Sequence, residues 1–129
     1  MQIKLKVWFE LDGEYIFGDG RAELLTLIDQ LGSMTKAAST LKMSYRHAWG
    51  QIRKLEERLG IKLVETRTGG RGGGETNLTD AAKDLLSKYD KLRNGLDMLA
   101  QEIYIENFGN SDYELSTERK GNISEFRRR

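Results

Sequence analysis

The chain of 129 residues contains no cysteine, no proline and only one histidine. Without cysteine it has no disulfide bonds and no thiolate metal sites, which suits a reducing cytoplasm. No apolar run reaches the roughly 18 residues of a membrane-spanning helix, and the first residues alternate in polarity instead of forming a signal peptide. We therefore expect a cytoplasmic protein in which residues 1–108 form one domain around one hydrophobic core.

The residues that catalysis requires are also scarce. His47 is the single histidine, and a histidine without a nucleophile or a carboxylate partner gives weak support for an active site. The glycine-rich stretch TRTGGRGGGETNLT, residues 66–79, resembles a phosphate-binding loop. However, Glu75 stands where such a loop needs lysine, and no helix follows directly. We expect no catalytic residue, no metal site and no cofactor, so the chain is not predicted to be an enzyme.

Charge is unevenly distributed, although the net charge of the whole chain is only +1. Between Ser33 and Gly74, nine Lys and Arg residues stand against three acids, a net charge of +6, whereas the rest of the chain has a net charge of −5. A basic segment between acidic flanks favours local contact with phosphates. Chance segregation of solvated charges is the alternative.

The spacing of apolar residues predicts the first elements of the chain. Residues 3–11 alternate in polarity, Asp12-Gly13 is a tight-turn dipeptide, and residues 15–17 resume the alternation, which predicts an N-terminal β-hairpin. The period then changes to that of helices. One helix is predicted from Gly20 to Gly32, a short one over 35–41 with Ser33 or Thr35 as its cap, and a third from the Ser44 cap to Gly60.

Two features narrow this helical pattern to a winged helix-turn-helix. The second and third helices are joined by a short turn, and the small residues Ala37 and Ala38 are placed where they would cross, as in a helix-turn-helix. A strand over 62–67, the glycine loop and a return strand over 76–78 then form a hairpin typical of the wing. The predicted fold class is mainly α with small β, or α+β.

The last predicted element is a long helix from Asp80 to Asn107, capped by Thr79. Its apolar residues are spaced alternately by three and four, which is the pattern of a coiled-coil seam. This pattern favours a homodimer; the alternative is a seam packed within one chain on the first helix and the N-terminal hairpin. The residues predicted to form the dimer contact are Leu85, Tyr89, Leu92, Leu96, Leu99 and Ile103. Residues 109–129 are expected to form a flexible tail.

Double-stranded DNA is the predicted partner. The outer face of the third helix is polar, and its first turn is the part of a recognition helix that contacts base edges in the major groove. The glycines of the wing would let its backbone approach a duplex, with Arg71 directed at the minor groove and the loop ordered by DNA. Trp49 is predicted to pack on the core rather than to contact DNA. The candidate DNA-binding residues are Thr35, Lys36, Ser44, Tyr45, Arg46, His47, Gly50, Arg53, Lys54, Arg67, Thr68 and Arg71.

Residues 33–67 resemble the winged-helix head of LysR-type transcription regulators, with paired alanines, a serine opening the recognition helix and the run QIRKLEERLG. Over residues 1–93 the chain resembles more closely the molybdate-responsive ModE-type regulators. The shared motifs are SY-x-x-AW at 44–49, TGG-x-GGG at 68–74 and a GRAELL-like start of the first helix at 20–25. This resemblance implies a dimeric regulator that binds a palindromic operator through helix and wing.

Full ModE-type regulators carry C-terminal oxyanion-binding domains that sense molybdate or tungstate. Residues 109–129 are too few for such a domain, so we expect any sensing to come from a separate oxyanion-sensing protein or an unexpected site. The leading interpretation is a sequence-specific transcriptional regulator. An architectural protein that coats DNA and a protein-interaction module remain alternatives.

Overall fold

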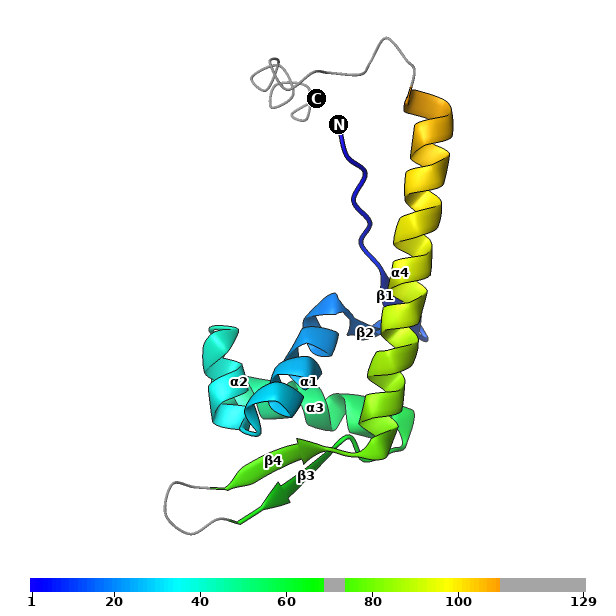
Figure 1. The fold of residues 1–129 in the computed structure, drawn as a ribbon. Helices are drawn as coiled ribbons and strands as arrows, with labels where there is room; N and C mark the ends of the chain where they lie inside the picture. The colour runs from blue at the N-terminus through cyan, green and yellow to red at the C-terminus, as the bar shows by residue number, and fades with distance from the viewer. Residues whose placement is uncertain (69–73, 110–129) are drawn as a thin grey trace. The chain divides into compact units, whose positions relative to one another are not determined.

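The structure is a computed structural model that describes residues 1–68 and 74–109. In chain order the elements are β1 (Trp8–Leu11), β2 (Glu14–Gly18), α1 (Asp19–Leu31), α2 (Met34–Thr40), α3 (Tyr45–Leu59), β3 (Val64–Arg67), β4 (Glu75–Leu78) and α4 (Asp80–Phe108) (Figure 1). The predicted class of a mainly helical winged helix-turn-helix with small β-sheets is confirmed. Most of the predicted flexible tail, residues 110–129, lies outside the described residues.

The chain divides into two compact units. One unit is Val7–Lys91, and the other combines Met1–Lys6 with the described residues from Leu92 onward. The first unit therefore holds both hairpins, α1, α2, α3 and the first turns of α4. The described residues include no helix that is both long enough and apolar enough to cross a membrane.

Local capping chemistry sets the ends of the helices. The Ser33 hydroxyl accepts a hydrogen bond from the Lys36 amide at 3.1 Å, so Ser33 rather than Thr35 caps α2. Ser44 caps α3 in the same way, through the amide of His47 at 3.0 Å. Gly60 ends α3 with φ of +69°, a left-handed conformation that costs glycine little. These helix ends agree with the ends predicted from the sequence, because each cap depends on residues only three or four positions apart.

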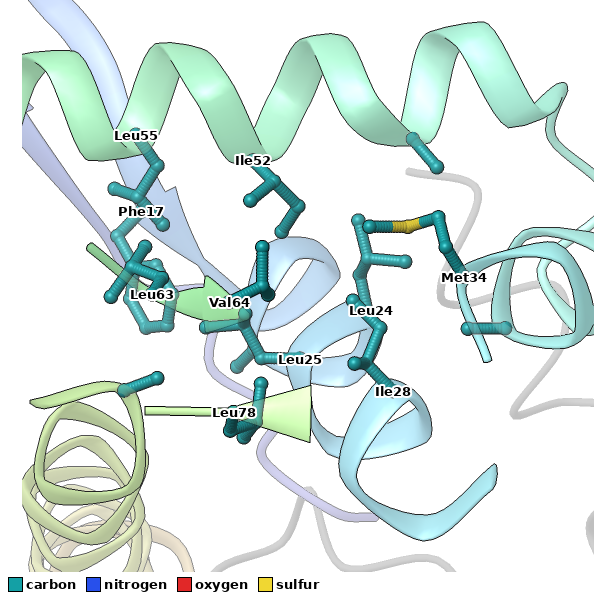
Figure 2. Close-up of a cluster of buried hydrophobic side chains, with 14 of the residues drawn as sticks. Phe17, Leu24, Leu25, Ile28, Met34, Ile52, Leu55, Leu63, Val64 and Leu78 are labelled. Carbon is teal, nitrogen blue, oxygen red and sulfur yellow. The ribbon is translucent and has the colours of Figure 1, made fainter. Parts of the chain in front are cut away.

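The core of the first unit lies between α3 and α1. Ile52 and Leu55 of α3 are fully buried. Ile52 points toward side chains of α1 and Leu55 toward Phe17 of β2, with Leu63, Val64 and Leu78 from the base of the wing beside them (Figure 2). Burying an aliphatic side chain of this size stabilises a fold by about 1.5–3 kcal/mol. The inner face of α3 is thereby fixed, and its outer face is left exposed.

The N-terminal hairpin is shorter than predicted. Asp12 and Gly13, with φ of +53° and +78°, form the expected tight turn. However, β1 begins at Trp8 rather than Ile3, and residues 1–7 belong to no strand. The reason is that β2 has only five residues, so it offers the earlier part of the alternating segment no partner.

The base of the wing is tied to the helices by side-chain and backbone hydrogen bonds. The Glu56 carboxylate of α3 accepts hydrogen bonds from the amides of Leu63 at 2.8 Å and Val64 at 3.4 Å. The Thr76 amide of β4 donates to the carbonyl of Gly32 at 3.0 Å. Strands β3 and β4 pair from Val64 opposite Leu78 to Arg67 opposite Glu75. Strand β3 is therefore anchored to α3 at the base of the wing, and β4 to the C-cap of α1.

Tyr89 corrects one prediction about α4. It was expected on the dimer seam, but only 3% of its surface is exposed and it packs within the chain. Its ring lies 5.0 Å from the ring of Phe17 and 5.6 Å from that of Phe9, both edge to face, and its hydroxyl donates to Asp19. The hairpin supplies these aromatic partners, which the heptad spacing alone could not reveal. Leu85 is also partly buried against the core.

Candidate nucleic-acid interface

The first turn of α3 presents its polar side chains to solvent. Tyr45 is 55% exposed, and Arg46 and His47 are also exposed, because the buried Ala48 sets the opposite side of the turn. Gly50 lies one turn further along the exposed face, and a Cβ there would meet nothing within 4 Å. Packing within the described residues therefore does not require glycine at this position. The surface is open to a large ligand.

A groove of about 480 Å³ lies between α3, the start of α2 and the wing. Its lining includes Thr35, Tyr45, Trp49, Arg53, Arg67 and Glu75. Four of these were candidate DNA-binding residues, and the groove brings them together from three elements. The charged residues in this lining are Arg53, Arg67 and Glu75, so two guanidinium groups and one carboxylate face the groove.

Trp49 connects the core to this groove. Its partly buried side chain packs against the hydrophobic core, as the sequence predicted. The same ring also carries Arg53, whose guanidinium carbon lies 5.0 Å from the ring centroid. Tyr45 also contacts the Trp49 ring, edge to face. The two ring centroids are 6.3 Å apart and the ring planes are at 75°. Tyr45, Trp49 and Arg53 form a continuous cluster along one flank of α3.

Lys54 lies on the opposite flank of α3, beside the N-terminal hairpin. Its ammonium is 2.8 Å from one carboxylate oxygen of Glu14, and the Arg58 guanidinium is 3.7 Å from the other. Arg58 also donates to the carbonyl of Leu11 at 3.3 Å. The hydrogen bond from Lys54, together with the charges of Lys54 and Arg58, lowers the pKa of Glu14. Lys54, a candidate DNA contact, is thus already paired with a carboxylate.

The remaining candidates are spread over three elements. Lys36 of α2 is exposed, as are Arg67 and Thr68 at the described end of the wing. Ser44 acts as a cap, and His47 lies 3.1 Å from the amide nitrogen of Gln51. Arg71 and the glycine-rich tip, with the predicted ordering of the loop, lie outside the described residues.

Sequence reasoning missed Glu14 and Thr66 as neighbours of the basic side chains. Glu14 meets Lys54 across a separation of 40 residues, and no periodicity in either segment points to the other. Thr66 precedes Arg67 on β3 and also lines the groove. The strand pattern predicted that Thr66 lies in the wing, but it gave no sign that Thr66 lies in the groove.

The candidate dimer residues beyond Tyr89 are largely solvent-exposed. Leu92 is 40% exposed, Leu99 51% and Ile103 49%, while Leu96 is partly buried. Met98 and Ile105, which lie off the predicted seam, are 65% and 61% exposed. The apolar surface of α4 is therefore broader than the predicted seam.

Comparison with known families identifies this arrangement. Residues 21–83, from α1 to the start of α4, match the bacterial regulatory helix-turn-helix protein of the lysR family. This part of the chain is therefore similar to the helix-turn-helix domain of the lysR family. The matched family consists of regulators and not enzymes, in agreement with the prediction from the sequence.

Curated relatives and a solved structure are also similar to part of the chain. It is 42% identical over 80 residues to the molybdenum transport protein ModE of Herbaspirillum seropedicae, covering 61% of this chain and 30% of that protein. It is also 42% identical over 72 residues to the transcriptional regulator ModE of Haemophilus influenzae, covering 56% and 28%. The BenM_DBD/benA site 1 DNA complex matches with a TM-score of 0.50 and 26% identity, over 65% of this chain and 92% of that one.

The matches differ in how much of each relative the chain covers. This chain spans less than a third of the length of both ModE relatives, at 30% and 28%. In contrast, it covers nearly all of the BenM DNA-binding domain. The similarity therefore spans a part of each ModE relative and most of the compared BenM chain.

Proposed function

We propose that the chain is a dimeric, sequence-specific DNA-binding transcriptional regulator that acts in the cytoplasm. The observation that carries this proposal is the exposed first turn of α3, which adjoins a groove containing Arg53 and Arg67. The similarity to the BenM_DBD/benA site 1 DNA complex supports the same conclusion, because that protein is bound to DNA.

In this proposal α3 enters the major groove with its first turn. Arg46 is long enough for a bidentate contact with guanine, which contributes about 1–3 kcal/mol of discrimination against another base. Tyr45 and His47 flank it and contact bases or phosphates. Arg53 and the wing residues Arg67 and Thr68 bind the sugar-phosphate backbone, which positions the protein without specifying a sequence. Arg71 enters or skirts the minor groove. Thr35 and Lys36 extend the backbone contact from α2.

The experiment that tests DNA binding is a mobility-shift assay with genomic fragments at several salt concentrations. Affinity should differ strongly between fragments and should fall steeply as salt rises, because phosphate contacts release counterions. No binding at low salt would contradict the proposal. Binding with only a few-fold difference between fragments would indicate an architectural DNA-coating protein instead.

The dimer of this proposal forms through the exposed apolar side chains of α4. Two copies of Leu92, Leu99 and Ile103 would bury each other and place two α3 helices on the half-sites of a palindromic operator. Sedimentation of a Leu92→Asp, Leu99→Asp variant tests this step. The variant should sediment at half the mass of the parent; an unchanged mass would contradict the dimer.

The names of the relatives suggest the regulated process. One ModE relative is named a molybdenum transport protein and the other a transcriptional regulator, so we propose control of genes for molybdate or tungstate uptake. We propose that oxyanion sensing comes from a separate protein or from another site. Titration of molybdate and tungstate against DNA affinity, with sulfate as the control, tests a direct response of this chain.

A further inference from the structure

The side chain of Arg53 is held by an aromatic ring rather than by a carboxylate. Its guanidinium carbon lies 5.0 Å above the Trp49 ring, one helical turn earlier on α3. In the part of the chain that the structure describes, Arg53 forms no ion pair within 4.0 Å. An exposed arginine otherwise samples many rotamers, so the ring restricts the directions in which the guanidinium can point.

The Trp49 ring is itself well fixed. Its neighbours Ala48 and Ile52 are completely buried, and the ring packs against the core from its position on the flank of α3. The edge-to-face contact with Tyr45 limits its movement on the other side. Trp49 therefore offers Arg53 a rigid platform connected to the core.

The platform holds Arg53 at the entrance of open space on the wing side of α3. Trp49 and Arg53 line both the groove of about 480 Å³ and a second hollow of about 300 Å³ below the base of the wing. Arg67 and Glu75 also line the first, and Lys62, Glu56 and Glu65 also line the second. A phosphate of the duplex backbone approaching this flank would meet a positive charge that is already oriented.

Without the ring, Arg53 has an alternative partner on its own helix. Glu57 is exposed and lies four residues further along α3, a spacing at which arginine and glutamate pair. Glu56 is less available, because its carboxylate accepts the amides of Leu63 and Val64. Loss of Trp49 would thus free Arg53 to turn along α3 toward Glu57, away from the wing.

We propose that Trp49 is a positioning residue that holds the Arg53 guanidinium for contact with a DNA phosphate. This inference rests on the proposed DNA-binding function and assigns to Trp49 a role beyond core packing. Trp49 itself need not touch DNA. Its effect on affinity passes through Arg53, and this dependence can be measured.

A double-mutant cycle tests the dependence. We expect Trp49→Leu to weaken DNA binding by about 3- to 10-fold and to reduce the slope of log affinity against log salt by about one. In an Arg53→Ala background, Trp49→Leu should have no further effect. In an Arg46→Ala background it should keep its full effect, because the cation–π contact of the ring is with Arg53.

Three outcomes would overturn the proposal while leaving the DNA-binding function intact. These are equal losses in both backgrounds, a loss of affinity with an unchanged salt slope, or no loss at all in Trp49→Leu. If the parent chain itself shows no salt-dependent binding, the proposed function fails rather than the role of Trp49. Trp49→Phe is the conservative control, and it should restore most of the affinity and the slope.

A measurement without DNA covers the case in which Trp49→Leu does not fold. The Nε–H proton of Arg53 should resonate upfield in the NMR spectrum of the folded parent chain, because the guanidinium carbon bonded to Nε lies 5.0 Å from the centroid of the indole ring. The shift should be smaller in Trp49→Phe. A resonance at the position typical of solvent-exposed arginines in the parent would contradict the contact on which the proposal depends.

Discussion

The two flanks of α3 carry similar cations in different surroundings. On the hairpin side, Lys54 and Arg58 share the carboxylate of Glu14. On the wing side, Arg53 rests on an aromatic ring beside a groove, and Glu75 is the acid that lines the groove with it. A cation that is paired with a carboxylate must give up that partner before it can bind phosphate. A cation over a ring keeps its charge available.

This difference changes the meaning of the basic segment between Ser33 and Gly74. Its charge of +6 counts Lys54 and Arg58 equally with Arg53 and Arg67. Glu14 lies outside the segment in sequence but neutralises part of it in space. The positive charge available to DNA is therefore concentrated on the first turn of α3 and on the wing side.

The largest effect is expected on the free energy of unfolding, from a change in the core beneath both flanks of α3. Ile52 is fully buried between them, and Ile52→Ala should lower the free energy of unfolding by about 2–5 kcal/mol through lost burial and a cavity. Urea denaturation measures this change. Gly50→Ala is the matched control on the exposed face, where the added Cβ meets nothing and helix propensity should raise stability by up to about 1 kcal/mol. A smaller loss for Ile52→Ala than about 1 kcal/mol would contradict the packing that fixes the two flanks.

The next largest effect is on DNA affinity, and it compares one cation from each flank of α3. Arg53→Ala should lower DNA affinity about tenfold at moderate salt and reduce the salt slope by about one, because one phosphate contact is lost. Lys54→Ala should change affinity by less than about threefold, since its ammonium is 2.8 Å from Glu14. Titrations of both variants over the same salt series provide the measurement. Equal losses for the two variants would show that the pairing with Glu14 does not distinguish the flanks.

These two flanks also show what the sequence can and cannot predict. The ends of α3 follow from Ser44 and Gly60, whose caps depend on residues within one turn. The spacing of apolar residues also placed Trp49 beside the core face. In contrast, the ion pair of Glu14 with Lys54 and the packing of Tyr89 on Phe17 join segments far apart in sequence. Such contacts depend on how elements pack, and the periodicity of a single element contains no information about them.

Removing the negative charge of Glu75 tests whether the wing side of α3 contacts DNA. Glu75 lines the groove and lies directly opposite Arg67 in the β3–β4 register. Glu75→Gln should raise DNA affinity by about two- to threefold, because a carboxylate near the phosphates is removed and Arg67 loses a neighbour of opposite charge. Asp29→Asn, on the exposed face of α1, is the control for net charge and should have a smaller effect. Unchanged affinity in Glu75→Gln would indicate that the groove does not meet the DNA backbone.

The smallest effect concerns the hairpin side and its dependence on pH. The hydrogen bond from Lys54 and the charges of Lys54 and Arg58 lower the pKa of Glu14 below its ordinary value of 4.5. A carboxyl whose pKa is lowered by folding stabilises the fold above its unfolded pKa, and this contribution is lost as pH falls through the lowered value. Parent and Glu14→Gln should therefore differ slightly in urea midpoint at neutral pH, and the difference should vanish in acid.

A difference that stays constant with pH would contradict the assigned pair. The same variant completes the comparison of the flanks, because Glu14→Gln leaves Lys54 without its carboxylate partner. In that background Lys54→Ala should cost more DNA affinity than it does in the parent. The hairpin side would then behave more like the wing side, which is expected only if pairing with Glu14, rather than position on α3, makes Lys54 unavailable to phosphate.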